Sequence, residues 1–329
     1  MDPNNKPPHY HDITDAARRL AGLARKTPLI KSAFLSDTFN AKVFLKAESL
    51  QHTGSFKFRG AFNFISQLTK HQKSKGLVAY SSGNHAHAVA KAASLEGINS
   101  TIVMPSDAPS IKVEATKKFG SKVVFYERNT ESREDIAAKI VKMTGGVLIP
   151  PYDHPLIIAG QGTVGLEIIN QLNDLDCKPD VVLVPCSGGG LIAGIAMSIK
   201  NFFPKSHIHP VEPEDFDDTA RSLESGKIEI IRENKVSICD ALLVNKPGQL
   251  SFSINRNLLS RGLTVSDKMI ERAMAFAFKN EKLVLEPGGA AALAAILDNK
   301  INLSGKNVVV VLSGGNVDPN TFKKILEHY

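Results

Sequence analysis

Short apolar runs alternate with longer amphipathic stretches along most of the chain. Two runs, 180–185 and 307–312, are almost wholly apolar, which is typical of parallel strands covered on both faces. Further strands are predicted over 42–47, 77–81, 100–104, 122–126, 147–149 and 207–211. Apolar positions at helical spacing predict helices over 12–24, 60–68, 84–96, 110–119, 133–143, 163–172, 191–202, 267–281 and 289–297. This alternation predicts an α/β fold with parallel sheets and helices on both faces.

Several helix ends carry recognisable boundary residues. Thr14 and Ser266 are candidate N-caps, because their hydroxyls can accept hydrogen bonds from the first free N–H groups of a helix. Gly97, Gly120 and Gly145 are candidate stops, because glycine adopts the left-handed conformation that ends many helices.

The stretch from Ser81 to about Tyr152 alternates strands and helices as a block of its own. We therefore expect a small domain over 76–152, inserted into a large domain formed by 1–75 and 153–329. We see no internal repeat and no low-complexity linker.

Composition narrows the class of protein. The 329 residues are 43% hydrophobic and 22% charged, close to the globular average, which excludes a disordered, collagenous or coiled-coil chain. The net charge is +7, but the basic residues are scattered and Trp is absent. We therefore expect a solvated basic surface and no nucleic-acid partner.

The cysteines and the N-terminus indicate a cellular compartment. Cys177, Cys186 and Cys239 are odd in number and lack C-x-x-C spacing, so we expect free thiols in a reducing compartment. The first residues lack the basic and apolar regions of a signal peptide, and no apolar run approaches the ~20 residues that span a bilayer. These observations predict a cytoplasmic protein without a membrane partner.

A glycine-rich loop, Cys186-Ser187-Gly188-Gly189-Gly190-Leu191, follows an apolar strand and opens a predicted helix. Glycines allow the backbone to approach an anion, and a helix N-terminus offers unpaired N–H groups, so a phosphate fits here. A tight turn is the simpler alternative. The loop also reads G-x-G-x-x-A, with Glu212 about 20 residues further on, so a nicotinamide dinucleotide stays open as a second ligand.

Three other loops join a predicted strand to a helix or follow a strand. In Thr53-Gly54-Ser55-Phe56-Lys57, the helix dipole would favour the neutral amine of Lys57, which can attack an aldehyde; a surface lysine is the alternative. The hydroxyl and N–H groups of Ser81-Ser82-Gly83-Asn84-His85 could hold a carboxylate, unless Ser82 only caps the helix. Ser313-Gly314-Gly315-Asn316 adds a polar strand end that could also be a turn. Together, the loops suit a phosphorylated aldehyde better than a dinucleotide.

These residues resemble the fold-type II pyridoxal-phosphate enzymes, and above all the serine racemase and threonine/serine dehydratase family. The resemblance extends from Thr27-Pro28-Leu29 to Asn316-Val317-Asp318. It is carried by four motifs in family order: Gly54-Ser55-Phe56-Lys57-Phe58-Arg59-Gly60-Ala61, Ser82-Gly83-Asn84-His85, Ser187-Gly188-Gly189-Gly190-Leu191 and Ser313-Gly314-Gly315-Asn316. The resemblance implies a tryptophan-synthase β-like fold with two open parallel-sheet domains flanked by helices.

The resemblance also implies a role for each motif. Pyridoxal 5'-phosphate would be bonded covalently to Lys57. Residues implied to bind the cofactor are Lys57, Asn84, Ser187, Gly188, Gly189, Gly190, Leu191, Glu286 and Ser313. Residues implied to bind the substrate are Ser81, Ser82, Asn84, His85 and Arg133. The freed Lys57 amine would remove the Cα proton, the β-hydroxyl would leave, and hydrolysis would give a keto acid and ammonia.

Ser82 bears on the outcome of that chemistry. Racemisation needs an acid or base on each face of Cα, and in serine racemases a serine at this position serves the face opposite the lysine. Serine here permits racemisation but does not require it, because the hydroxyl can also bind a carboxylate.

Glu212-Pro213-Glu214-Asp215-Phe216-Asp217-Asp218 resembles the divalent-cation loop of the family. Glu212 and Asp218 would supply carboxylates and Phe216 a backbone carbonyl, and such hard oxygen ligands suit Mg²⁺ or Ca²⁺. A solvated acidic turn is the alternative. The cation interpretation also removes Glu212 from the ribose contact that a dehydrogenase needs.

We therefore expect a lyase acting on L-threonine and L-serine, with racemisation of serine as an open question. A serine racemase proper and a hydroxyaspartate dehydratase are alternatives within the family. An NAD-dependent dehydrogenase using Gly188-x-Gly190 and a non-catalytic binding protein are alternatives outside it. The family also implies a homodimer. Because the sequence ends soon after Asn316, we expect no C-terminal regulatory domain.

Overall fold

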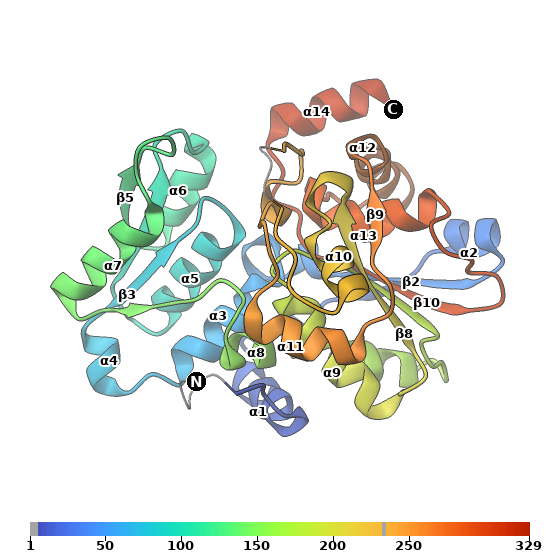
Figure 1. Ribbon diagram of the computed structural model, residues 1–329, viewed down its shortest axis with the longest axis horizontal. Helices are drawn as coiled ribbons and strands as arrows, with labels where there is room; N and C mark the ends of the chain where they lie inside the picture. Colours follow the sequence, from blue (N-terminus) through green and yellow to red (C-terminus); the bar gives the residue numbers. More distant parts are fainter. Residues whose placement is uncertain (1–5, 232–234) are drawn as a thin grey trace.

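Two separate β-sheets organise the chain in this computed structural model, which describes residues 6–231 and 235–329 (Figure 1). Within those residues the larger sheet has strand order β1-β2-β10-β7-β8-β9, and the smaller has β5-β4-β3-β6. The larger sheet contains β1 (Leu29–Lys31), β2 (Lys42–Ala47), β7 (Val181–Pro185), β8 (His207–Pro213), β9 (Leu263–Val265) and β10 (Asn307–Leu312). The smaller sheet contains β3 (Leu77–Tyr80), β4 (Ser100–Pro105), β5 (Lys122–Tyr126) and β6 (Val147–Leu148).

Helices surround both sheets. They are α1 (Tyr10–Leu20), α2 (Ala33–Phe39), α3 (Lys57–Ser66), α4 (Lys70–Ser74), α5 (Asn84–Leu95), α6 (Ser110–Lys118), α7 (Arg133–Thr144), α8 (Pro155–Asn173), α9 (Gly190–Phe202), α10 (Asp218–Ser225), α11 (Gln249–Leu258), α12 (Asp267–Phe276), α13 (Pro287–Leu297) and α14 (Pro319–His328). Short helical turns are η1 (Glu48–Leu50), η2 (His52–Gly54), η3 (Glu214–Phe216), η4 (Asp240–Leu242) and the π-helical η5 (Ala277–Glu281).

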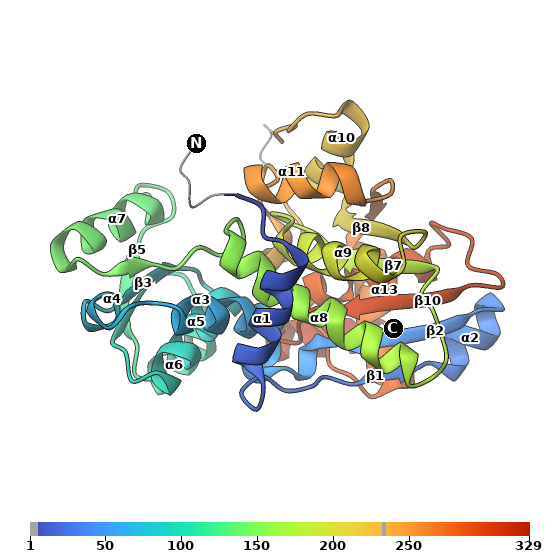
Figure 2. The ribbon, with the colours of Figure 1, turned by 90° about the horizontal axis from the view of Figure 1, so that it is seen from below.

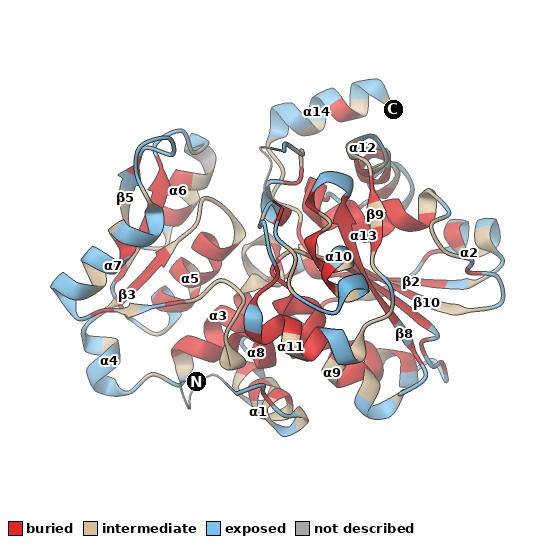
Figure 3. Cartoon of the chain, viewed as in Figure 1, coloured by how far each residue is buried: buried red, intermediate tan, exposed pale blue. Residues whose placement is uncertain are grey.

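Strand pairing is parallel throughout the described sheets except between β1 and β2. Alternate residues of β10 point to opposite faces: Val308 and Val310 pack in the core beside α12 and α13, whereas Val309 and Val311 pack against α8 and α9. Figure 3 shows the buried residues concentrated along the sheets and the helices that cover them. The predicted α/β class with parallel sheets is confirmed.

Helix α8 is much longer than the predicted 163–172, and it packs on both α3 and α9. Figure 2 shows α1 lying across it. A Cβ atom added at Gly160 would lie 2.7 Å from the backbone oxygen of Arg59, so glycine allows α8 and α3 to approach closely. The first half of α8 contains glycines and apolar residues on all sides, so it shows no amphipathic spacing and was not predicted.

Helix boundaries were predicted with mixed success. The Thr14 cap is wrong, because α1 begins at Tyr10 and the Thr14 hydroxyl donates to the backbone oxygen of His11 within the helix. The Ser266 cap is confirmed: its hydroxyl accepts from the N–H of Met269. Gly97, Gly120 and Gly145 all have positive φ just after a helix, as a stop requires.

The strands of the smaller sheet all lie between Leu77 and Leu148, within the predicted inserted segment 76–152. The domain boundaries themselves stay a prediction. Across the described residues, no helix combines the length and the hydropathy needed to cross a membrane.

Candidate active site

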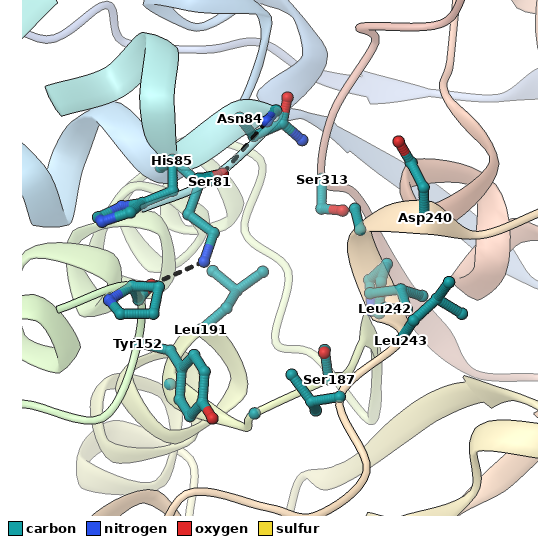
Figure 4. Close-up of a pocket in the computed structure, with 18 of the residues that line it drawn as sticks. Ser81, Asn84, His85, Tyr152, Ser187, Leu191, Asp240, Leu242, Leu243 and Ser313 are labelled. Carbon is teal, nitrogen blue, oxygen red and sulfur yellow. Dashed lines mark hydrogen bonds between the residues drawn. The ribbon is translucent and has the colours of Figure 1, made fainter. Parts of the chain in front are cut away.

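A cavity of about 520 Å³ lies between the two sheets, and several of the predicted loops line it (Figure 4). Residues that directly follow β3, β7 and β10 contribute to its wall, as do the first turns of α3, α5 and α9. In open parallel sheets, ligands bind at the carboxyl ends of the strands, and helix N-termini there attract anions. The fold therefore brings together at one place motifs that are far apart in the sequence.

Lys57 is the first residue of α3 and lines the cavity. Its Nζ donates a hydrogen bond to the backbone oxygen of Pro151 at 2.7 Å. Burial lowers the pKa of Lys57 to about 8, and the nearby carboxyl of Glu286 opposes the shift only in part. The amine is therefore far easier to deprotonate than an ordinary lysine, whose pKa is ~10.4.

The loop from Ser81 to His85 joins β3 to α5 along the cavity wall. The N-cap of α5 is Gly83, without a side-chain capping bond, so the interpretation of Ser82 as a cap is wrong. The Ser81 hydroxyl instead accepts from the N–H of Gly83 at 3.2 Å. Burial, and then the charge of Lys57, lower the pKa of His85 to about 3, so its imidazole is neutral at physiological pH.

Asn84 connects the loop to the opposite wall. Its Nδ2 donates to Glu286 Oε1 at 2.5 Å, and its Oδ1 accepts from Asn316 Nδ2 at 2.7 Å. Burial raises the pKa of Glu286 to about 7, assisted by the negative charge of Asp240. Ser313 is buried directly after β10 and lines the same cavity (Figure 4). Three of the predicted ring-binding residues, Asn84, Glu286 and Ser313, therefore line the same cavity, and Asn84 is hydrogen-bonded to Glu286.

The glycine loop follows β7, and the residues from Ser187 to Leu191 all line the cavity. Gly189 has φ +89° and is the N-cap of α9, where no side chain supplies a capping bond. A Cβ at Gly190 would lie 2.7 Å from the backbone oxygen of Tyr152. Only glycine fits this tight turn without strain, and the uncapped helix end leaves N–H groups available for an anion.

These observations test whether pyridoxal phosphate fits the chain. An uncapped glycine cradle suits a phosphate, a lysine amine of lowered pKa at Lys57 suits an aldehyde, and Asn84 and Ser313 contribute polar groups to the same cavity. A cavity of about 520 Å³ also falls within the ~300–1,000 Å³ range of cofactor sites. The residues present fit the group.

Arg133 begins α7 and lines the cavity from the side of the smaller sheet. Its guanidinium carbon is 5.4 Å from the centre of the Tyr80 ring, and its Nε pairs with Glu134 at 2.9 Å. The arginine is partly exposed and its ionic partner is a neighbour in sequence, so an incoming carboxylate can compete for it.

The predicted cation loop lies outside the cavity lining. Glu212, in β8, and Asp218, at the start of α10, are both fully buried. Glu212 accepts from the N–H groups of Thr219 and Ala220, whereas neither carboxylate oxygen of Asp218 has a hydrogen-bond partner among the residues that the structure describes. Burial and the neighbouring Asp218 raise the pKa of Glu212, and burial raises that of Asp218 to about 8. Residues 6–231 and 235–329 hold no group of three or more His, Cys, Asp or Glu side chains arranged for a metal.

The burial of Glu212 also disfavours a dinucleotide. The dehydrogenase alternative needs this carboxylate to be open to a ribose hydroxyl, and it is instead bonded to the backbone of α10.

Sequence reasoning missed several residues of the cavity wall, among them Phe56, Lys112, Tyr152 and Asp240. Lys112 of α6 pairs with Asp240 of η4 at 2.8 Å, which connects the two sides of the cavity. Tyr152 packs so closely on the glycine loop that a Cβ at Gly188 would lie 2.3 Å from its ring. Phe56 belongs to the lysine motif and could have been found there, but nothing in the spacing of the other three indicates the site.

Comparison with known proteins places the chain among relatives. The sequence model of the family described as "Pyridoxal-phosphate dependent enzyme" matches residues 20–314. An L-threo-3-hydroxyaspartate ammonia-lyase of Saccharomyces cerevisiae is 41% identical over 319 residues, covering 97% of this chain and 96% of that protein. A catabolic L-threonine dehydratase of Staphylococcus aureus is 41% identical over 321 residues, covering 96% of this chain and 91% of that protein.

Solved structures agree with the sequences. The structure of maize serine racemase superposes with a TM-score of 0.90 at 38% identity, covering 98% of each chain. The predicted family resemblance and fold class are confirmed.

Proposed function

The chain belongs to the pyridoxal-phosphate dependent enzymes, and from that premise we propose that it converts L-threonine and L-serine to 2-oxobutanoate and pyruvate with release of ammonia. The observation that carries this proposal is the Lys57 amine of lowered pKa, which shares one cavity with the glycine loop and the Ser81–His85 loop. The relatives named for dehydratase and ammonia-lyase activities support the same class of reaction.

Several residues would hold the cofactor. The uncapped N–H groups at Gly189, Gly190 and Leu191 suit the phosphate, and Ser187 adds a hydroxyl beside them. Asn84, Glu286 and Ser313 would contact the ring. When bound, pyridoxal phosphate supplies an aldehyde that takes up amines and a ring that withdraws electrons from Cα.

Lys57 would act as the base once the substrate amine has displaced it. Its lowered pKa leaves a useful neutral fraction near physiological pH, so Nζ can accept the Cα proton. The backbone oxygen of Pro151 would orient the amine by accepting one of its hydrogens. Loss of the β-hydroxyl and hydrolysis then release the keto acid and ammonia.

The substrate carboxylate would lie against Ser81, Ser82, Asn84 and His85. The N-terminus of α5 has no side-chain cap, so its first N–H groups and the two serine hydroxyls offer donors to an anion. His85 is neutral, and its Nε2 contacts the backbone oxygen of Ile149 at 3.0 Å, which holds the ring in place.

L-threo-3-hydroxyaspartate is a second candidate substrate, favoured by the charge of the cavity wall. Arg133, Arg128 and Lys112 all line the cavity. The ionic partner of Arg133 is its neighbour in sequence, whereas those of Arg128 and Lys112 come from other parts of the chain. A substrate with a second carboxylate would find compensating charge there, and the Saccharomyces cerevisiae relative is named for that substrate. Measuring kcat/KM for L-threonine and for L-threo-3-hydroxyaspartate decides which of them the enzyme prefers.

A divalent cation is proposed at Glu212, Asp218 and the backbone oxygen of Phe216. The pKa values of both buried carboxylates are raised, so the charge of Arg221, which acts on Asp218, compensates them only in part. Within residues 6–231 and 235–329, both Asp218 oxygens also lack a hydrogen-bond partner, so a further positive charge would stabilise the pair. Mg²⁺ or Ca²⁺ would supply that charge through oxygen ligands of the kind these ions prefer. The ion would stabilise the loop rather than take part in the reaction, because its ligands lie outside the cavity lining.

A homodimer and a cytoplasmic location complete the proposal. The homodimer follows the family expectation, and exposed apolar side chains such as Phe34 and Phe278 would be covered by a partner. The cytoplasmic location is supported by the three cysteines, which are buried free thiols.

Proton NMR of L-serine in D₂O tests the activity directly, using the protein loaded with pyridoxal phosphate and Mg²⁺. The formation of pyruvate while the remaining serine keeps its α-proton identifies a dehydratase. Faster loss of the α-proton than formation of pyruvate identifies reprotonation, and chiral analysis then detects D-serine. Serine unchanged in both respects, with L-threonine and L-threo-3-hydroxyaspartate equally inert, contradicts the proposed function.

Ser82→Ala separates the two outcomes of the same experiment. If the Ser82 hydroxyl serves the face of Cα opposite Lys57, the variant keeps pyruvate formation and loses D-serine formation. Unchanged formation of D-serine by the variant would show that another group serves that face.

A further inference from the structure

Four charged side chains are buried together beneath the first turns of α3, outside the cavity lining. Lys46 comes from β2, Glu48 from η1, Arg59 from α3 and Glu167 from α8, and we refer to them as the buried quartet. The side chains of Lys46, Glu48 and Arg59 are at most 1% exposed, and that of Glu167 is 19% exposed. The quartet contains two positive and two negative groups, so its formal charges balance.

Arg59 is the centre of the buried quartet. Its Nε and Nη2 donate to the two carboxylate oxygens of Glu48, each at 2.8 Å, and its Nη1 donates to Glu167 Oε1 at 2.7 Å. Lys46 Nζ donates to the other oxygen of Glu167 at 2.6 Å, and also to the backbone oxygen of Thr27 and to Gln171. A planar guanidinium held by two carboxylates has one allowed orientation.

Stability alone is a poor explanation for this arrangement. Burial would lower the pKa of Arg59, but the carboxylates of Glu48 and Glu167 raise it above its ordinary value, so the guanidinium stays charged. Burying four charges costs desolvation energy that their mutual attraction often only offsets, and apolar side chains of similar size commonly stabilise as well. Apolar side chains, however, do not fix the orientation of the groups that they contact.

The helix that carries Lys57 needs such a fixed orientation. Helix α3 begins at Lys57, and its N-cap, Phe56, has no side-chain capping bond. On the side of the cavity, the N–H of Phe56 donates to the backbone oxygen of Ser313 at 3.2 Å. Two residues after Lys57, and away from the cavity, the side chain of Arg59 forms ion pairs with Glu48 and Glu167. Lys57 therefore lies between two anchors, and the buried quartet is one of them.

We propose that the buried quartet is a positioning device, in which the two-pronged pairing of Arg59 sets where the first turn of α3, and with it the amine of Lys57, lies in the cavity. This inference rests on the proposed function, because it assumes that Lys57 bonds to the cofactor. Arg59 contacts neither the cavity nor the reacting atoms, and it acts through the backbone of α3.

Arg59→Lys is the informative substitution, because lysine keeps the charge but loses the planar fork. We expect kcat to fall roughly 10- to 100-fold with KM changed much less, since a misplacement of about 1 Å at a reacting group costs that much. The visible absorbance of the bound cofactor, titrated with pH in the absence of substrate, should shift its midpoint, because it reports the surroundings of the Lys57 nitrogen. Glu96→Gln is the control, since it removes a charge from the distant, partly exposed pair with Lys73.

The outcomes separate positioning from stability. If Arg59→Lys lowers the unfolding temperature of the protein while kcat and the absorbance midpoint match those of Glu96→Gln, the quartet only stabilises the fold and the proposal is wrong. If Arg59→Lys yields no folded protein, Glu167→Gln is measured by the same criteria, because its site is partly exposed and glutamine keeps an acceptor for Arg59. Failure of the proposed function would be visible separately, as a wild-type protein that gains no visible absorbance with pyridoxal phosphate.

Discussion

At the scale of single residues, Lys57 has an amine that burial makes less basic, in a wall that also contains Glu286. Burial alone would disfavour any charge there, and the two groups compensate each other only in part. The result is a lysine and a glutamic acid that both titrate within about one unit of neutrality. Groups of this kind are typical of sites that move protons.

Lys57→Ala should abolish turnover, because the variant loses both the attachment of the cofactor and the base. We expect formation of pyruvate from L-serine to fall at least ~100-fold, the lower bound for loss of a general base. Lys205→Ala, an exposed lysine away from the cavity, is the matched control. Turnover by Lys57→Ala close to that of the control would remove Lys57 from the mechanism.

The lowered pKa of Lys57 makes a separate prediction about cofactor uptake. The amine must be neutral to attack the aldehyde, so the rate at which cofactor-free protein binds pyridoxal phosphate should rise with pH and level off above about 8. Stopped-flow absorbance on mixing measures this rate. A rate that keeps rising toward the ordinary lysine pKa of ~10.4 would show that Lys57 is not perturbed.

Which site residues could be predicted from sequence depends on where their signal lies. Lys57, Ser82, Asn84 and the glycines belong to local motifs, and the structure brings them to one cavity. Tyr152 and Asp240 reach the same cavity only through long-range folding, and their flanking residues carry no chemical pattern. The roles assigned to all of these residues stay predictions.

At the scale of elements, the junction of β7 and α9 combines strain with function. Gly189 has φ +89°, and a Cβ atom there would lie 2.7 Å from Asn255 Nδ2. That same nitrogen donates to the backbone oxygen of Gly189 at 3.2 Å, so α11 holds the loop in place. The helix end is therefore shaped by a neighbouring helix rather than by its own capping residue.

Gly189→Ala should weaken cofactor binding. The left-handed conformation costs alanine ~1–2 kcal/mol, and the clash with Asn255 adds displacement of the loop. Gly226→Ala is a matched control, because Gly226 also has positive φ (+75°) but has open space around its Cβ position. Titration with pyridoxal phosphate should show a higher Kd for Gly189→Ala alone. Equal affinities in the two variants would contradict the role of this loop in binding the cofactor.

Sequence patterns found long elements better than short ones. The bounds of β2, β5 and β10 match the prediction, because each contains at least three consecutive apolar residues that are mostly β-branched or aromatic. The edge strands β1 and β9 were missed because three residues are too few to show a period. Helices α2, α4, α10, α11 and α14 were also missed. Helices α2 and α4 have only 7 and 5 residues, too few for a clear period, whereas α10, α11 and α14 are amphipathic and could have been found from their spacing.

At the scale of the whole molecule, the proposed cation should control stability. In its absence, the pKa values of two buried carboxylates are raised, and the charge of Arg221 compensates them only in part. Saturation with Mg²⁺ at 100 times its dissociation constant would stabilise the fold by about 2.7 kcal/mol, measurable as a rise in unfolding temperature that EDTA reverses.

Asp218→Asn identifies the ligands of that cation. The variant should lose the response to Mg²⁺ and, in EDTA, unfold at a higher temperature than the wild type, because one buried charge is gone. Asp215→Asn, which changes an exposed carboxylate of the same loop, should keep the response. A full response in Asp218→Asn would place the cation elsewhere.

The order of strands in the larger sheet has a consequence for how the chain is made. Strand β10 pairs with both β2 and β7, so the centre of the larger sheet is formed by the last of its described strands to leave the ribosome. Until residues 307–312 emerge, two apolar strand edges stay open to other nascent chains. The strands of the smaller sheet are contiguous in sequence and can pair much earlier during synthesis. A premature stop codon anywhere before β10 should therefore yield an aggregation-prone client of chaperones rather than a truncated enzyme.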